Sequence, residues 1–210
     1  MQISHKTQAA LQFLAPAAIL YVLLGTYLLN GSLPSLSIFS EKSLGLVFVG
    51  LMAMLVQDIV PKPLKEFFVF WRINDRLPGH RAFTKRTLRH PQIDRDRIPN
   101  IRVLTQLSPP QQQNAFYKFY KELSKEDSVQ HLSQRYIAWR DLSALMAIFT
   151  LVSIPVLATF PDHNAIPAGL ILAGTSGLAC LASGFAAKNV ANSMIIQVLC
   201  LTSFKEVSDV

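Results

Sequence analysis

The basic residues of this chain are concentrated in one central segment that lies between stretches with almost no charge. Sixteen of the twenty Lys and Arg residues lie between Lys62 and Arg140. Two apolar stretches precede this segment and two follow it: Ala9–Leu29, Leu44–Val60, Leu142–Phe160 and Ile166–Ala187. Each is close to the ~20 residues that a helix needs to cross the hydrocarbon core of a bilayer. The pattern predicts an all-α membrane protein with four spans.

A soluble helical protein with fully buried helices is the alternative to four spans. Such a protein usually shows polar residues at a 3.6-residue spacing on its helices, and the second to fourth stretches show none. The chain is therefore predicted to have four parts. These are an N-terminal transmembrane hairpin (1–60), a small basic helical domain (61–141), a C-terminal transmembrane hairpin (142–187) and a C-terminal interfacial or cytoplasmic helix (188–210).

The short loops and flanks predict the orientation, because basic residues resist transfer across the membrane. The loop Asn30–Ser43 has one Lys and one Glu, and the loop Pro161–Ala165 has Asp162 and no base. Both loops are expected outside the cytoplasm. Both termini and the large basic loop are then cytoplasmic, which is an N-in, C-in topology.

An aromatic segment begins where the second span ends at Pro61 and Pro63. Its rings and bases alternate: Phe67, Phe68, Phe70 and Trp71 with Lys62, Lys65 and Arg72. An interfacial helix needs rings at the headgroup level and cations beside anionic lipid, so these four aromatic residues are candidate interfacial anchors. The equally weighted alternative is a helix that buries the rings in the core of the basic domain.

The rest of the basic domain shows turn signals and then helical periodicity. Residues 74–100 are polar and contain several prolines, which predicts turns and short helices. A helix is expected to start at Pro109 and Pro110. A second amphipathic segment runs without Pro or Gly into the third span, so one continuous helix is predicted from about Ser128 into the membrane.

The basic domain carries a strong positive charge, with sixteen bases against seven acids and a net charge of +9 between residues 61 and 140. Such a segment attracts anionic lipid, and the same field attracts a nucleic-acid backbone. The alternative is that the charge only records topology. Within it, four arginines are candidates for contact with an anionic partner or lipid: Arg76, Arg81, Arg86 and Arg89.

The fourth span has a face with almost no side-chain bulk. Candidate helix-packing residues on or beside it are Gly169, Ala173, Gly177, Cys180 and Gly184. Helices in lipid associate through close backbone approach at such faces. The face is either a seam between subunits or the lining of a pore, or it packs within one chain. The apolar stretch Ala191–Phe204 that follows is either a surface helix or an extension of the span.

Catalytic signatures are absent from the sequence. There is no metal-ligand spacing, no nucleophile motif and no phosphate-binding glycine loop, so no cofactor, no metal and no enzymatic activity are predicted. No ionisable residue lies near the middle of a predicted span, which argues against an ion-coupled transporter.

Several short motifs resemble one group of proteins over residues 72–141. They are RLPGHRAF at 76–83, HPQID at 90–94, PPQQQNAFYKFYKE at 109–122 and Trp139-Arg140-Asp141. The segment resembles small multi-pass bacterial membrane proteins of anti-phage defence operons, including retron-type membrane effectors. The resemblance implies an inner-membrane, toxin-like effector. It also implies an inhibiting partner, either a reverse transcriptase with its RNA–DNA hybrid or another cytoplasmic defence protein.

The function expected from residues and resemblance together is that of a non-enzymatic inner-membrane effector. It would form a homo-oligomer and permeabilise the membrane when an inhibiting partner releases it. The alternative is a membrane-anchored scaffold that recruits a soluble protein or nucleic acid through its basic domain.

Overall fold

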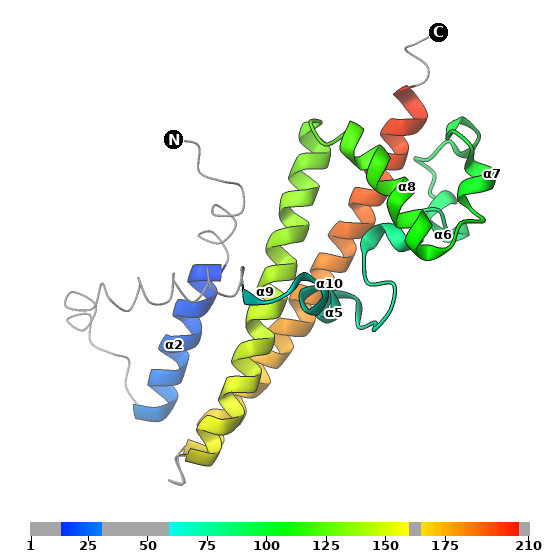
Figure 1. The fold of residues 1–210 in the computed structure, drawn as a ribbon. Coiled ribbons are helices and arrows are strands. Elements are labelled where there is room, and N and C mark those ends of the chain that lie inside the picture. Colours follow the sequence, from blue (N-terminus) through cyan, green and yellow to red (C-terminus); the bar gives the residue numbers. More distant parts are fainter. Residues whose placement is uncertain (1–13, 31–58, 160–164, 206–210) are drawn as a thin grey trace. The chain divides into compact units, whose positions relative to one another are not determined.

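The described part of the chain is helical. The computed structural model describes residues 14–30, 59–159 and 165–205, and these contain helices and turns but no strand (Figure 1). The elements are α2 (Ala15–Asn30), α5 (Lys62–Phe70), η2 (Pro78–Arg81), α6 (Lys85–Leu88), η3 (Arg95–Arg97), α7 (Ile101–Leu104), α8 (Pro109–Glu122), α9 (Asp127–Thr159) and α10 (Ala165–Lys205). The all-α prediction is confirmed for these residues. Most of the predicted second span lies outside them, as do nearly all residues of the two predicted outer loops.

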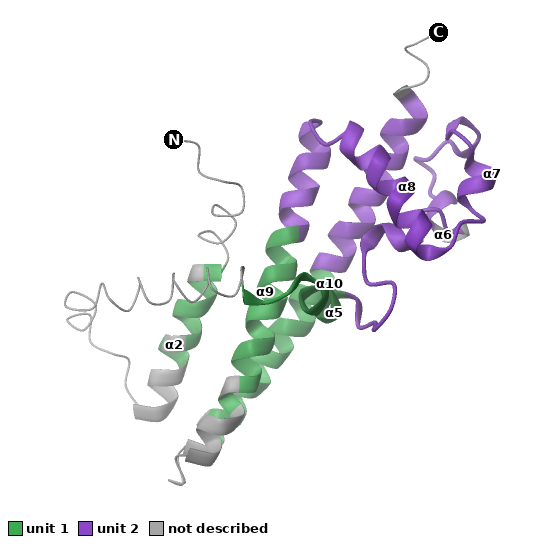
Figure 2. Cartoon of the chain, in the orientation of Figure 1, with its two compact units in different colours: residues 1–69, 137–186 green, residues 70–136, 187–210 purple. Residues whose placement is uncertain are grey.

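The chain divides into two compact units (Figure 2). Unit 1 contains residues 1–69 and 137–186, and unit 2 contains residues 70–136 and 187–210. Both long helices, α9 and α10, contribute residues to both units. The predicted boundaries of the basic domain, residues 61–141, remain a prediction.

Prolines and capping residues in the sequence of unit 2 agree with the observed start of α8 and with the turns before it. Helix α8 starts at Pro109, as predicted, and the backbone N–H of Ser108 donates to Gln111 Oε1 at 3.0 Å. This bond satisfies a group beside the helix start that has no intrahelical partner. Between residues 74 and 100 the chain forms turns and the short elements η2, α6 and η3, which also confirms the prediction.

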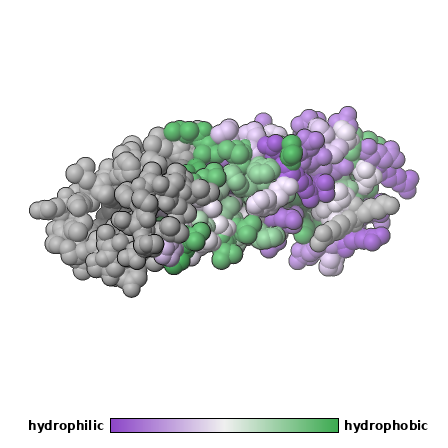
Figure 3. Space-filling view, turned by 90° about the horizontal axis from the view of Figure 1, so that it is seen from below, coloured by the Kyte–Doolittle hydropathy of each residue, from purple (hydrophilic) through white to green (hydrophobic). Residues whose placement is uncertain are grey.

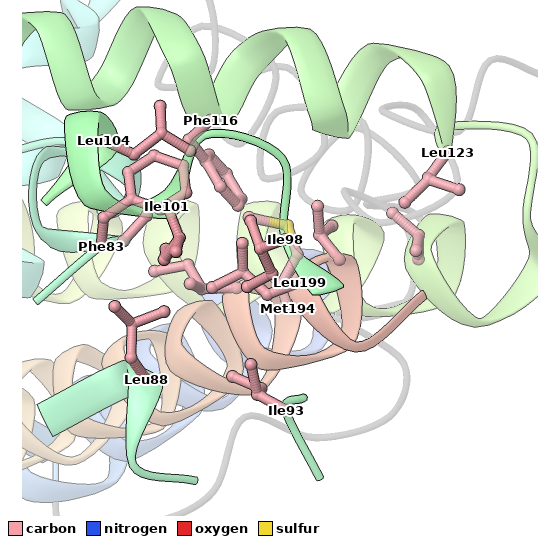
Figure 4. Packing of buried hydrophobic residues seen from close by; sticks show 14 residues of the cluster. Phe83, Leu88, Ile93, Ile98, Ile101, Leu104, Phe116, Leu123, Met194 and Leu199 are labelled. Carbon is pink, nitrogen blue, oxygen red and sulfur yellow. The ribbon is translucent and has the colours of Figure 1, made fainter. Parts of the chain in front are cut away.

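An apolar core holds unit 2 together. Phe116 of α8 and Leu123, which directly follows α8, are buried, as the helical periodicity indicates. They share the core with residues of α7, α9 and the last part of α10. Figure 4 shows these side chains, with Met194 and Leu199 of α10 next to Ile98. The C-terminal apolar stretch therefore supplies core residues to unit 2.

Gly79 allows η2 to approach α8 closely. A Cβ atom at this position would lie 2.7 Å from Phe116 Cδ1 and 2.6 Å from Gln113 Oε1. Gln112 strengthens the same region, because its Nε2 donates to the Leu107 carbonyl at 3.0 Å and its Oε1 accepts the Phe83 N–H at 3.4 Å. The segment that follows η2 is thereby fixed against α8.

The two long helices bear on the predicted helix from about Ser128 and on the two alternatives for the C-terminal apolar stretch. Helix α9 starts at Asp127 and continues to Thr159, in agreement with the helix predicted from about Ser128. Helix α10 includes both the fourth apolar stretch and the stretch after Lys188 without a break. The second stretch is therefore an extension of the fourth predicted span.

Unit 1 has a smaller apolar core. Leu14 and Ala18 at the start of α2 pack with Leu145 and Met146 of α9 and with Cys180 of α10. Phe68 of α5 and Val60 pack against the edge of this cluster. Four separate segments of the sequence thus contribute to this core.

Candidate functional site

The small-residue face of α10 packs within the chain in unit 1. A Cβ atom on Gly184 would lie 2.9 Å from the Phe68 carbonyl oxygen and 3.4 Å from Ser143 Oγ. One on Gly177 would lie 3.8 Å from Thr150 Cγ2, while one on Gly174 would meet nothing within 4 Å among the described residues. Gly184 and Gly177 therefore face α5 and α9. This arrangement corresponds to the alternative of packing within one chain.

Hydroxyl groups connect the helices of unit 1 along what we call the hydroxyl seam: Tyr21, Ser143, Thr150, Ser153 and Ser176. Ser176 Oγ donates to the Leu172 carbonyl at 2.6 Å and accepts from Thr150 Oγ1 at 3.0 Å. Ser143 Oγ donates to the Cys180 carbonyl at 3.1 Å.

Tyr21 joins α2 to the same seam. Its hydroxyl donates to the Phe149 carbonyl at 3.1 Å and also contacts Ser153 Oγ, and its ring stacks on Phe149 with the centroids 4.1 Å apart. The seam thus contains hydroxyls from α2, α9 and α10.

Large apolar side chains of unit 1 lie on its outside. We call the exposed side of α10 the outward apolar face: Leu170, Ile171, Leu178, Leu181 and Phe185. Leu178 is 69% exposed and Leu151 of α9 is 62% exposed. On the side drawn in Figure 3, hydrophobic residues form part of the visible surface. Unit 1 therefore has polar contacts inside and apolar side chains outside.

One described helix is long and apolar enough to cross a membrane. It is the part of α10 from Gly169 to Phe204. Only 33% of the apolar 18-residue stretch within it is buried inside the protein. A central helix of a soluble protein would be mostly buried.

Four charged side chains form a buried charge network in unit 1: Lys65, Glu66, Arg140 and Asp141. Lys65 Nζ lies 3.3 Å from Asp141 Oδ1, with both side chains at most 5% exposed. Arg140 donates to the same Oδ1 from Nε at 3.0 Å and from Nη2 at 2.9 Å, and its Nη1 lies 3.7 Å from Glu66 Oε1. Two cations and two anions therefore balance where α5 meets α9.

The network bears on the two alternatives for the aromatic segment. In the interfacial alternative Lys65 would lie beside lipid headgroups, whereas it is 2% exposed and paired with Asp141. Burial of a charge is tolerated only with a partner and hydrogen bonds, so Lys65 fixes α5 to α9. The sequence signal was present in two adjacent opposite-charge pairs, Lys65-Glu66 and Arg140-Asp141, at the ends of apolar stretches.

The aromatic anchor candidates occupy different environments. Phe67 and Phe68 are partly buried and contact each other edge to face, with ring centroids 5.7 Å apart. Phe70 is partly buried, while Trp71 is 55% exposed and ends α5 with a left-handed φ of 52°. Of the four, Trp71 is thus the most accessible to a membrane surface.

Three of the four candidate arginines have described side chains, and these lie in different surroundings. Arg81 lines a cavity of about 540 Å³, whereas Arg89 lines a separate cavity of about 390 Å³ with Arg95. Arg76 donates from Nε to the Ile73 carbonyl at 2.6 Å. The side chain of Arg86 lies outside the described residues.

Within the described residues there is no group of three or more His, Cys, Asp or Glu side chains placed to hold a metal ion. The chain matches no protein-family model, no curated protein and no solved structure.

Proposed function

We propose that this chain is a non-enzymatic inner-membrane effector with four spans, cytoplasmic termini and a cytoplasmic basic domain. Unit 1 inserts in the bilayer, and the basic domain responds to a cytoplasmic partner. The observation that carries the proposal is the packing of unit 1, with hydroxyl groups between the helices and large apolar side chains outside.

This packing fits a lipid environment. Apolar burial gives little drive for association in lipid, so helices associate through small residues and interhelical hydrogen bonds. Gly177, Gly184 and the hydroxyl seam supply both. The outward apolar face then meets acyl chains, a favourable contact that water would not provide.

The effector activity follows from how weakly the seam is held. An interhelical hydrogen bond in a membrane contributes only about 0.6 kcal/mol on average, so each hydrogen bond of the seam can be exchanged at low cost. In the proposal, release of the partner lets copies of the chain associate and turn the seam toward water. The resulting path is lined by hydroxyls and conducts ions without a fixed charge.

A second candidate function is a membrane-anchored scaffold. The exposed guanidinium groups of Arg81 and Arg89 favour it, because such groups bind phosphate or carboxylate in a bidentate way. A scaffold recruits its partner and leaves the membrane closed.

Inducible expression in bacteria with a membrane-potential dye separates the two functions. Depolarisation after induction, in the absence of the partner, is the result expected of an effector. The Leu178→Arg variant should abolish it, because an arginine near the centre of a span costs about 2.5–3.5 kcal/mol on insertion.

Val103→Arg is the matched control, since Val103 is 59% exposed in α7 of the basic domain. Its depolarisation should equal that of the wild type. An intact potential with protein in the membrane fraction would favour the scaffold, and wild-type protein in the soluble fraction would refute both functions.

A further inference from the structure

Unit 2 contains a cavity whose charged lining residues, among those that the structure describes, are all basic. It has a volume of about 540 Å³ and is lined by Arg72 and Arg81 from the first part of the unit and by Lys188 from α10. None of these three side chains forms an ion pair with a carboxylate of the described residues, and none of the described residues that line the cavity is acidic. We call it the basic cavity.

Neutral polar side chains accompany the cations. Thr84 and Thr87 both line the basic cavity, with their Oγ1 atoms 3.1 Å apart. His90 also lines it, and its Nδ1 accepts the N–H of Gln92 at 3.4 Å. The neutral imidazole ring then carries its proton on Nε2, which remains a donor.

The remaining lining is apolar. Phe70 and Leu77 come from the start of unit 2, and Ile195 and Ile196 come from α10. A volume of about 540 Å³ falls in the range of about 300–1,000 Å³ that is typical of sites for organic ligands. A bare phosphate or sulfate ion would leave most of this space and the apolar wall without contacts.

We propose that the basic cavity binds a phosphate ester of a small organic molecule. The phosphate group takes Arg72, Arg81 and Lys188 as its counter-charges, because phosphate offers several acceptors to guanidinium and ammonium donors. The organic part lies against the side chains of Phe70 and Ile195. The same chemistry is found in a soluble nucleotide and in the headgroup of an anionic phospholipid.

Titration calorimetry of the full-length protein in phosphatidylcholine nanodiscs tests whether the ligand is a soluble phosphate ester. The probes are adenosine 5′-monophosphate, adenosine and inorganic phosphate. The monophosphate should bind more tightly than either of the other two, because only it engages both the cations and the apolar wall.

Native mass spectrometry of detergent-purified protein tests whether the ligand is the headgroup of an anionic phospholipid. The probes are phosphatidylglycerol and phosphatidylcholine. Selective retention of phosphatidylglycerol assigns the cavity to a headgroup, and selective binding of the monophosphate assigns it to a soluble ester. Absence of both preferences overturns the proposal.

Arg81→Gln and Lys188→Gln should each lower the affinity for the preferred probe about tenfold or more, since a hydrogen bond to a charged group is lost. Arg102→Gln is the control, because Arg102 is exposed in α7 and does not line the cavity. Equal weakening by all three variants would reveal a non-specific charge effect and overturn the proposal. The inference goes beyond the effector function, since binding is measured on purified protein whether or not the chain depolarises cells.

Discussion

At the scale of single residues, Gly184 has less room for a side chain than Gly174 or Gly177 of the same helix. An added Cβ would lie 2.9 Å from the backbone carbonyl oxygen of Phe68, and a backbone atom cannot move aside as the end of a side chain can. We expect Gly184→Ala to lower the free energy of unfolding by about 1–3 kcal/mol. Thermal unfolding in detergent measures this.

Gly174 supplies the matched control on the same helix, because a Cβ there meets nothing within 4 Å among the described residues. Gly174→Ala should leave the stability unchanged or raise it by up to about 1 kcal/mol through helix propensity. Equal destabilisation by the two variants would contradict the close approach of α5 to α10.

Substitutions in the buried charge network should lower the folding stability by different amounts. Asp141→Asn removes the carboxylate that lies 3.3 Å from the buried Lys65 Nζ and should cost about 3–5 kcal/mol of folding free energy. Lys65→Met should cost less, because Asp141 keeps Arg140 at 2.9 Å. The double variant should be more stable than Asp141→Asn alone. A double-mutant cycle by chemical unfolding tests this order, and strictly additive losses would contradict the pairing.

At the scale of helices, the pairing of α9 with α10 can be tested by a cross-link. Ser143 Oγ lies 3.7 Å from Cys180 Sγ, a separation compatible with a disulfide if residue 143 carries a thiol. In a Cys200→Ala background, Ser143→Cys should form an intramolecular disulfide with copper phenanthroline as oxidation catalyst. Mass spectrometry detects it as the loss of two hydrogen atoms.

Thr175→Cys in the same background is the control, because Thr175 is exposed on α10. It should form no intramolecular bond with Cys180. The pairing of α9 and α10 would be refuted if Ser143→Cys stayed reduced under conditions that oxidise an exposed thiol pair.

Local signals predicted the helices, because their causes are local. Pro109 and Pro110 start α8, and the uninterrupted run after Ser128 gives α9. The charge network was missed because Lys65 and Asp141 lie far apart in the sequence and meet only through packing. The basic cavity was missed for the same reason, since Lys188 of α10 reaches it from another part of the chain than Arg72 and Arg81. Of the three candidate arginines whose side chains the structure describes, Arg81 lines it, and Arg76 and Arg89 do not.

At the scale of the whole molecule, the central claim is that unit 1 lies in a bilayer and unit 2 in the cytoplasm. The charge distribution along the sequence indicated this division, and the outward apolar face of α10 supports it. Leu178 and Val103 provide the comparison, because they are 69% and 59% exposed in the protein alone. Both residues would be accessible to water without a bilayer, whereas in a bilayer residue 178 would be shielded from water and residue 103 would not.

The most direct test is labelling of Leu178→Cys and Val103→Cys with a membrane-impermeant maleimide, in a Cys180→Ala, Cys200→Ala background. In inverted inner-membrane vesicles, the cysteine at 103 should react and the one at 178 should stay unlabelled until the protein is denatured. In intact cells neither should react. Equal labelling of the two cysteines in the vesicles would contradict the account, because residue 178 would then face water.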